Sequence, residues 1–350
     1  MAVGQGVLVG NLSYLSFGRE ITYGAYVTGT AALNFMSASL KMTKETKILE
    51  EIQTSRTNSN SIGLGRSVEG EVEYIFSPMN LACNYLLQNA FGGGPVTTAT
   101  ATGETVGGLG FQHTIDIANF AATYSSLSCN MRKGQATDGK VFEYCGLRVN
   151  ELTMKAELDE PLVMSVSMIG KDASITSNDI SSSIVSTTNQ QPLSFVNGRF
   201  SVENSPGSLT STSFWHVQSF EFKLSNNLNA DSGARRIGSD TLQVLPAGMA
   251  QFELKATMRF DTTTAYAAMV AGTRLAGEFE FKGDTMTGSA IQQGLKVTMP
   301  YLIITDAGDP EVGGPGDQLT SEVTFAVLRD PTAAGYAVKA VVTNLTSTYV

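Results

Sequence analysis

The feature that most constrains this chain of 350 residues is a series of segments that occurs twice, in the same order. Each copy consists of an alternating strand, a long polar run, a second alternating strand and a short helix. The first copy comprises SASLKM (37–42), the polar run 43–67, EGEVEYIF (69–76) and SPMNLACNYLLQNAFGGG (77–94). The second copy comprises SFEFKL (219–224), the polar run 225–248, QFELKATMRF (251–260) and DTTTAYAAMVAGT (261–273). This matched order predicts a tandem duplication of one β-rich unit.

The two helical segments carry matching start and stop signals. Ser77 is a candidate N-cap with Pro78 at the first helical position, and Asp261 is the corresponding cap in the second copy. Gly92 and Gly272 follow the last apolar residues, where a glycine often ends a helix. We therefore expect one short helix per unit, directly after its second long strand.

Each copy also ends in a predicted hairpin. NELTMKAEL turns at residues 159–161 into LVMSVSMIGKD (162–172), whereas GLKVTMPYLIIT reaches LTSEVTFAVLRD (319–330) through a longer acidic loop. Val166 and Met168 in the first hairpin match Val323 and Phe325 in the second, and each alternates with a small polar residue. The chain is thus expected to be mostly β, with a β-sandwich or barrel-like fold in each unit.

These boundaries divide the chain into three parts. We predict a first unit with an N-terminal arm at residues 1–172, a linker rich in Ser, Thr and Asn at 173–190, and a second unit at 191–350. Near the start of the second unit, LSFVNGRFSV (193–202) is expected to form a hairpin at its Asn-Gly pair.

Composition excludes several classes of protein. Hydrophobic residues make up 42% and charged residues 16%, with 35 glycines, which favours strands and turns in a folded chain. The formal net charge of −9 opposes tight DNA binding, which normally needs a basic surface. No window approaches about 20 uninterrupted apolar residues, and the first charge is Arg19, so neither a membrane span nor a secretory signal is expected.

Cysteines and histidines predict no metal or nucleophilic site. Cys83, Cys129 and Cys145 are odd in number and lack CxxC spacing, so we expect free thiols in a reducing compartment. His113 and His216 lie outside any metal-binding pattern and are expected to be ordinary polar residues.

The remaining candidate motifs also have simpler explanations. GQATDGKV (134–141) resembles a phosphate-binding loop, but Val141 stands where the motif needs Ser or Thr, and a turn between strands accounts for it. Glu69, Glu71 and Glu73 alternate along one strand and therefore share a solvated face. The acidic loop 306–317 lacks calcium-loop spacing, which leaves only an adventitious cation open there. We predict no catalytic residue, no cofactor and no metal site, and hence a protein that is not an enzyme.

The stretch from SFEFKLSNN through QFELKATMRFD to AYAAMVAGT resembles the tail tube (major tail) proteins of long-tailed bacteriophages. FGREITYGAYVTG (17–29) and the NELTMKAEL hairpin are also similar to that family. The resemblance implies two packed β-sheets flanked by a helix, here present twice. It further implies a structural virion protein, assembled in the host cytoplasm, whose stacked rings form the hollow tail tube through which DNA passes without specific binding. Tape measure, tail terminator and tail-tip proteins are the implied partners.

The duplication leaves two ring arrangements open. Three chains can supply six units with pseudo-sixfold symmetry, or six chains can form the ring with the second copy outside. We favour three chains because both copies keep the whole series of elements. Pairing strand edges around a closed ring also removes the hazard of exposed edges.

The two polar runs are the predicted contacts between stacked rings, because long loops that project along the axis can reach the next ring. Arg235 and Arg236 are expected to pair with carboxylates of another subunit, and the acidic balance fits a channel that repels phosphate. The candidate contact residues are Lys44, Lys47, Glu50, Glu51, Arg56, Asn226, Asn227, Asp231, Arg235 and Arg236.

Two other functions remain open at the level of sequence. A capsid-decoration or adhesin-like β protein would share the acidic, Ser/Thr-rich composition, but it is not expected to repeat matched helices after matched strands. A β-rich hydrolase or lyase would need a catalytic cluster that the sequence does not contain. Stacked rings with a central pore, seen by negative-stain microscopy, distinguish the tube from both.

Overall fold

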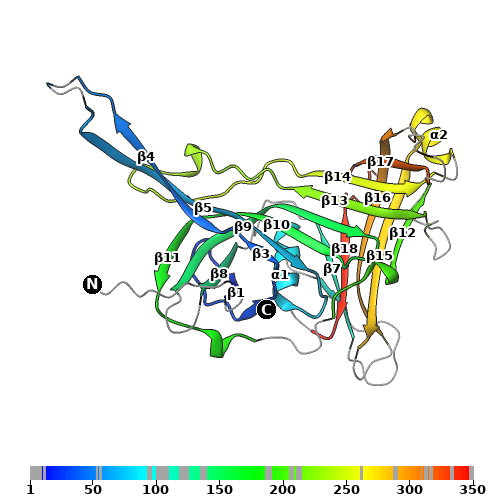
Figure 1. Cartoon of the computed structure of the whole chain (residues 1–350), viewed down its shortest axis with the longest axis horizontal. Helices are drawn as coiled ribbons and strands as arrows, with labels where there is room; N and C mark the ends of the chain where they lie inside the picture. Colours follow the sequence, from blue (N-terminus) through cyan, green and yellow to red (C-terminus); the bar gives the residue numbers. More distant parts are fainter. Residues whose placement is uncertain are drawn as a thin grey trace.

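Strands dominate the computed structural model, as the alternating segments predict, and the mostly β fold class is confirmed (Figure 1). The structure describes residues 10, 13–52, 54, 57–92, 97–99, 110–117, 126–134, 140–185, 191–204, 209, 215–260, 263–286, 291–308, 310, 314, 318–331 and 335–346. The strands up to the middle of the chain are β1 (Tyr14–Glu20), β2 (Ala31–Leu33), β3 (Ser37–Ala38), β4 (Lys41–Leu49), β5 (Asn60–Ile75), β6 (Thr97–Ala99), β7 (Phe111–Asp116), β8 (Ser126–Lys133), β9 (Lys140–Glu157), β10 (Val163–Gly170) and β11 (Asp172–Thr176). The later strands are β12 (Gly198–Glu203), β13 (Val217–Ser225), β14 (Gln251–Arg259), β15 (Leu275–Thr285), β16 (Gln292–Ala307), β17 (Thr320–Val327) and β18 (Lys339–Asn344). The helices are α1 (Leu81–Ala90) and α2 (Thr264–Ala271), with short 3-10 turns η2 (Ser181–Ser183), η3 (Phe195–Asn197) and η5 (Ser232–Ala234).

Two long strands, β9 and β16, organise the two copies in the same way. The N-terminal half of β9 lies between β8 and β11, and its C-terminal half lies between β10 and β13. The N-terminal half of β16 likewise lies between β15 and β18, and its C-terminal end pairs with β17. Each long strand therefore changes its neighbours half-way along, which brings two packed layers together around one core.

One sheet runs continuously through both copies. Its strand order is β4–β5–β10–β9–β13–β14–β17–β16, and every neighbouring pair is antiparallel. The join between the copies is the pairing of Glu151–Glu157 in β9 with Ser219–Ser225 in β13. In Figure 1 this sheet extends from the blue hairpin of β4 and β5 to β16 and β17 near α2.

The buried face of this sheet follows the predicted alternation. Val72 and Tyr74 of β5 are fully buried, whereas Glu69 and Glu71 on the same strand are exposed. Farther along the sheet, an aromatic cluster continues the core, with the ring centroids of Phe220 and Phe279 4.8 Å apart. Each such side chain contributes roughly 1.5–3 kcal/mol on burial, so the alternation fixes which face of the sheet is covered.

The copies also match in individual hydrogen bonds. The Phe76 N–H donates to the Leu162 carbonyl oxygen at 3.0 Å, and the Phe260 N–H donates to the Leu319 oxygen at 2.9 Å. Both bonds join the end of the second long strand to the start of the closing hairpin strand. This repeated detail supports the duplication read from the sequence.

The helix starts differ from the sequence prediction. Residues 77–80 form a turn, closed by the Asn80 N–H donating to the Ser77 oxygen, so α1 starts only at Leu81. Asn80 is its N-cap, because its Oδ1 accepts from the amides of Ala82 and Cys83. α2 follows Thr263, and the predicted cap Asp261 lies outside the described residues.

The glycine predicted to end each helix is the C-cap residue in the second copy, but it lies one residue beyond the C-cap in the first. Gly272 ends α2 in the left-handed conformation, with φ of 60°, as expected for a C-terminal glycine. In the first copy Phe91 is the C-cap, and Gly92 follows it with φ of 103°.

The predicted hairpin at 193–202 is wrong. Residues Phe195–Asn197 form η3, and Gly198 then begins β12, which pairs with β15. Gly198 has a φ of −87°, whereas the tight Asn-Gly hairpin turn needs a positive φ at both central residues. In the predicted linker 173–190, β11 continues to Thr176 and pairs with β9, and the unit boundaries themselves remain a prediction.

Candidate assembly surfaces

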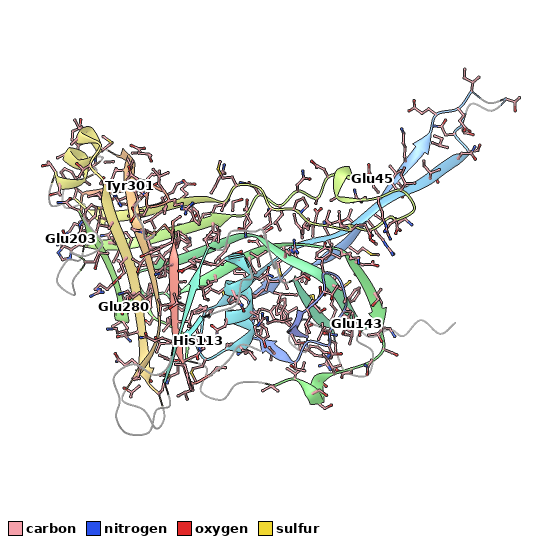
Figure 2. The ribbon with its side chains drawn as sticks, turned by 180° about the vertical axis from the view of Figure 1, so that it is seen from behind. Glu45, His113, Glu143, Glu203, Glu280 and Tyr301 are labelled. Atoms are coloured by element: carbon pink, nitrogen blue, oxygen red, sulfur yellow. The ribbon has the colours of Figure 1, made fainter. Side chains whose placement is uncertain are left out.

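The hairpin formed by β4 and β5 projects beyond the rest of the chain (Figure 1). The sequence suggested a polar loop at 43–67. In the structure β4 and β5 instead remain paired along the arm, with Lys44 opposite Arg66 and Leu49 opposite Asn60. Figure 2 labels Glu45, which belongs to β4 of this arm. Ile48 is 61% exposed and Ile52 is fully exposed. Apolar side chains held in water on a projecting arm are typical of a surface that another molecule covers.

Most of the candidate contact residues of the first run lie on this arm. Lys44, Lys47, Glu50 and Glu51 are all exposed. Glu51 accepts a hydrogen bond from the Asn60 amide at 2.7 Å, which ties the two strands together near the tip. Arg56 lies outside the described residues.

The second polar run folds back onto the first copy. It encloses a small apolar cluster of Leu228, Ala234, Leu242 and Leu245, against which Tyr23 packs. The sequence showed no apolar period in this run, so the cluster was missed. The three leucines, spaced through otherwise polar residues, are the signal that was available.

Asn226 is an internal residue and presents no surface. Its side chain is fully buried and donates to the Ala90 oxygen at 2.8 Å and to the Val149 oxygen at 2.9 Å. Asn227 is exposed, has the left-handed φ of 47° that asparagine tolerates, and donates to the Met249 oxygen. Of the Asn-Asn pair, only Asn227 is therefore placed where another chain can meet it.

The rest of the second run is held by Arg66, at the base of the projecting arm. The Arg66 side chain forms ion pairs with Asp172 at 3.1 Å and with Asp240 at 3.3 Å. The main-chain N–H of Arg66 also donates to the main-chain oxygen of Asp240. Arg235 is half-buried and packs over Gly65, where an added Cβ would lie 2.3 Å from the arginine Nε. The other candidates of this run, Asp231 and Arg236, are exposed.

The outer face of the eight-stranded sheet is polar, and carboxylates outnumber lysines on it. Cross-strand and same-strand ion pairs connect some of them, such as Lys223 to Glu151 at 3.2 Å and Lys255 to Glu253 at 3.1 Å. The hydrogen bond that the Lys255 ammonium donates to Glu253 raises the pKa of Lys255, so this lysine is charged near neutral pH. By register, the acidic residues of this face are Glu69, Glu71, Glu73, Glu151, Glu157, Glu221, Glu253, Asp306 and Glu322, and the basic residues are Lys41, Lys155, Lys223, Lys255 and Arg259.

A model of the phage tail tube protein family matches residues 10–327 of the chain. The chain belongs to the phage tail tube protein family. No curated protein matches it. The family is one of structural tail proteins and not of enzymes, and it makes this chain a component of the phage tail. The resemblance noted in the sequence is thereby confirmed.

In a tail tube protein the free strand edges are as relevant as the loops. Within the described part of the chain, β3 and β4 pair only with β5, and β16 beyond Leu302 pairs only with β17. The continuous sheet thus ends in an unpaired strand at each side. An unpaired edge presents a row of N–H and C=O groups that another chain can bond.

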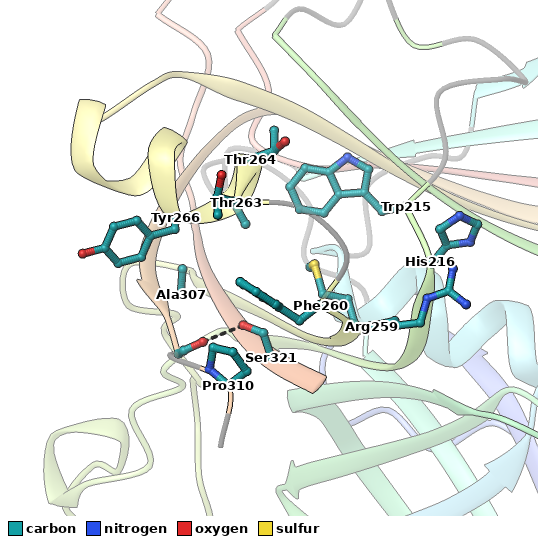
Figure 3. A pocket seen from close by; sticks show the side chains of 13 residues that line it. Trp215, His216, Arg259, Phe260, Thr263, Thr264, Tyr266, Ala307, Pro310 and Ser321 are labelled. Atoms are coloured by element: carbon teal, nitrogen blue, oxygen red, sulfur yellow. Dashed lines mark hydrogen bonds between the residues drawn. The ribbon is translucent and has the colours of Figure 1, made fainter. Parts of the chain in front are cut away.

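A crevice of about 470 Å³ lies beside the β16 edge, under α2 (Figure 3). Trp215, Phe260 and Tyr266 line it, together with Arg259 and His216. The lining includes a hydrogen bond from the Ser321 hydroxyl to the Gly308 oxygen at 2.7 Å. Among the described lining residues there is no carboxylate to pair with the histidine.

The titratable residues considered in the sequence have structural roles. His113 is buried, and its Nε2 lies 3.1 Å from Asn344 Oδ1 and 2.7 Å from the Thr346 oxygen; burial lowers its pKa (Figure 2). Burial raises the pKa of the Cys83 thiol to about 12 and that of the Cys145 thiol to about 11. Cys129 is also buried, its pKa is raised, and all three cysteines are free thiols. These thiols stay protonated near neutral pH and are poor nucleophiles.

The other chemical predictions concern loops and metal sites. Lys133 pairs with Lys140, so β8 and β9 are consecutive antiparallel strands on either side of the GQATDGKV segment, whose residues 135–139 lie outside the described part. The described residues contain no cluster of three or more metal-ligating side chains. No helix among them is long and apolar enough to cross a membrane.

Proposed function

We propose that three copies of this chain close into a ring, and that stacked rings form the tail tube through which DNA passes. The observation that carries the proposal is the continuous sheet, in which β13 of the second copy pairs with β9 of the first over seven residue pairs. Both copies therefore contribute strands side by side. A ring of six chains with the second copy outside would require this junction to open.

The dimensions of the sheet support the same arrangement. Strands in a sheet lie about 4.8 Å apart, so three chains with eight strands each give a circumference on the order of 115 Å. The corresponding diameter is roughly 37 Å before strand tilt widens it. Six chains arranged with all strands in one ring would double this width.

The polar face of the sheet then lines the channel. Its excess of carboxylates over lysine and arginine side chains repels the phosphates of DNA at short range, so that the duplex slides through without binding. The opposite face, with Tyr74 and Phe222, is covered by the rest of the chain. Glu221 and Glu253 are among the carboxylates of this acidic chain that would face the channel.

The projecting arm of β4 and β5 reaches the next ring in the stack. It presents Ile48 and Ile52 with charged neighbours such as Lys47, a combination suited to an interface with an apolar centre and a polar rim. The second run contributes through Asp231 and Arg236, its exposed candidates. Tape measure, tail terminator and tail-tip proteins complete the tail, which is assembled in the host cytoplasm.

Electron microscopy of the purified protein, with and without a tail-tip nucleus, tests this proposal. We expect stacked rings with a central pore. Replacing the exposed Arg236 with Glu should shorten the tubes, whereas Lys282→Glu, an equal change of charge on the outer strand β15, should leave their length unchanged. Monomers that never polymerise, even when nucleated, would contradict the tube and favour a decoration or adhesin-like protein.

A further inference from the structure

We infer that Lys41–Thr43 of one chain pairs with residues 306–308 of the neighbouring chain, in the register of the β9–β13 junction inside each chain. The inference rests on the proposed ring and specifies its seam. It follows from the duplication: the chain contains one junction between a first and a second copy, and the ring must form the same junction between chains. The internal junction is therefore a template for the external one.

The first step is to match β16 with β9. Val166 of β10 faces Leu152, Ser167 faces Glu151, and a bulge then places Val149 opposite Met168. In the second copy Val323 of β17 faces Ala307, Thr324 faces Asp306, and a bulge places Ile304 opposite Phe325. The bulge falls at the same step in both ladders. Ala307 thus corresponds to Leu152, and Asp306 corresponds to Glu151.

The second step is to match β3 and β4 with β13. Phe220 faces Ala256 in β14 and Lys223 faces Glu253. Ala38 likewise faces Val72 in β5, and Lys41 faces Glu69. Val72 faces Val166 of the first closing hairpin, and Ala256 faces Val323 of the second, so Val72 and Ala256 hold equivalent positions. The strands β3 and β4 can therefore be superposed on β13 residue by residue. Lys41, Met42 and Thr43 then correspond to Lys223, Leu224 and Ser225.

Transferring the internal register gives the seam. Inside the chain Leu224 faces Leu152 and Ser225 faces Glu151. Between chains Met42 therefore faces Ala307 and Thr43 faces Asp306. Met42 is 44% exposed, and pairing would place it beside Ala307, which lines the crevice under α2.

The seam also repeats an ion pair. Lys223 Nζ lies 3.2 Å from Glu151 Oε2 across the internal junction. The corresponding residues at the seam are Lys41 of one chain and Asp306 of the next. Lys41 and Asp306 are both exposed in the single chain, so both are available to form this contact.

The seam is shorter than its internal template. The Gly308 N–H donates to the Glu322 oxygen at 2.9 Å and therefore faces β17. Pro310 stands two residues on, at the position that corresponds to Lys155, and has no N–H to continue that ladder, so the extended edge ends there. A proline near the end of an edge strand limits further pairing. The edge therefore accepts the neighbouring chain over a short segment, whereas the internal junction extends over seven residue pairs.

Disulfide trapping in assembled tubes tests the register. Facing residues in an antiparallel pair have Cα atoms about 4.5–5.5 Å apart, within the range that a disulfide spans. The variant Thr43→Cys with Asp306→Cys should give covalent dimers and trimers of the chain on non-reducing gels after mild oxidation. The control, Thr43→Cys with Lys255→Cys, places the second cysteine three strands away, about 14 Å by strand spacing, and should give none.

The outcomes separate the seam from the ring. Tubes that assemble from the first variant but give no more crosslinks than the control would overturn the register and leave the ring standing. An unmodified protein that forms no rings would overturn both. If the cysteine variant fails to assemble, charge exchange decides the matter: Lys41→Glu should slow assembly about fivefold or more, and Lys41→Glu with Asp306→Lys should restore it. Failure of the double change to restore assembly would overturn the inference.

Discussion

The side-chain amide of Asn226 donates a hydrogen bond of 2.8 Å to the main-chain oxygen of Ala90, at the last residue of α1. Asn226 follows the first strand of the second copy, whereas α1 belongs to the first copy. The same amide also bonds the Val149 oxygen in β9. One buried side chain thus joins the two copies at the point where their sheets become continuous.

Replacing Asn226 with Ala should destabilise the junction. Two buried carbonyl oxygens would lose their donor, at a cost of about 2 kcal/mol or more in the free energy of unfolding. The control Asn227→Gly keeps the left-handed backbone at an exposed site and should change stability by about 0.5 kcal/mol or less. Urea unfolding of both variants provides the comparison, and equal effects would contradict the role of Asn226.

Removing the apolar side chains of the projecting arm should block stacking but not ring closure. In the variant with Ile48→Ser and Ile52→Ser, the sheet edges remain intact and the arm loses its apolar centre. We expect soluble rings that do not lengthen, detected by microscopy and light scattering. Val196→Ser is the matched control, because Val196 is an apolar residue of η3 whose exposed fraction of 71% lies between those of Ile48 and Ile52. Normal tubes from the double variant would show that the arm does not join rings.

Reversing charge in the channel should make tubes bind DNA. Glu221→Lys with Glu253→Lys converts two carboxylates of the polar sheet face into cations, and DNA affinity should rise with a steep dependence on salt. Asp284→Lys with Glu203→Lys, on β15 and β12 away from that sheet, keeps the same net charge without changing the channel. Co-sedimentation of tubes with linear DNA measures the difference. Equal DNA binding by the two variants would indicate that the sheet face does not line the channel.

Alkaline pH should destabilise the fold through its buried thiols. Burial, and then the charge of Glu20, raise the pKa of Cys145 from 9.0 to about 11, and burial raises that of Cys83 to about 12. The thiols of the unfolded chain ionise near pH 9.0. The contribution of the buried, protonated thiols to the free energy of unfolding is therefore complete below that pH and is lost as pH rises toward 11–12. Thermal unfolding from pH 8 to 11 should show a falling midpoint. Cys145→Ala should reduce the slope.

The sequence predicted what depends on local alternation and missed what depends on distant partners. The solvated face of Glu69, Glu71 and Glu73 is read directly from a period of two. The outer part of β5, from Asn60 to about Arg66, is exposed or half-buried on both sides of the strand, so it carries no such period and was taken for a loop.

The second run shows the same limit. Its leucines pack against one another and against residues of the first copy that are distant in sequence, Tyr23 and Ile169. The β9–β13 junction, likewise, depends on two strand edges that carry no mark in the sequence. The N-cap of α1 was misplaced by three residues because Asn80, beyond the Ser-Pro pair, is the side chain that reaches the free amides.

The central claim is that three chains close each ring through sheets that contain both copies. Cryo-electron microscopy of assembled tubes, with the chains in each ring counted from the density, tests it most directly. We predict three chains per ring, with the polar faces of both copies lining the channel in near-sixfold symmetry. Six chains per ring, with the second copy outside the channel wall, would contradict it.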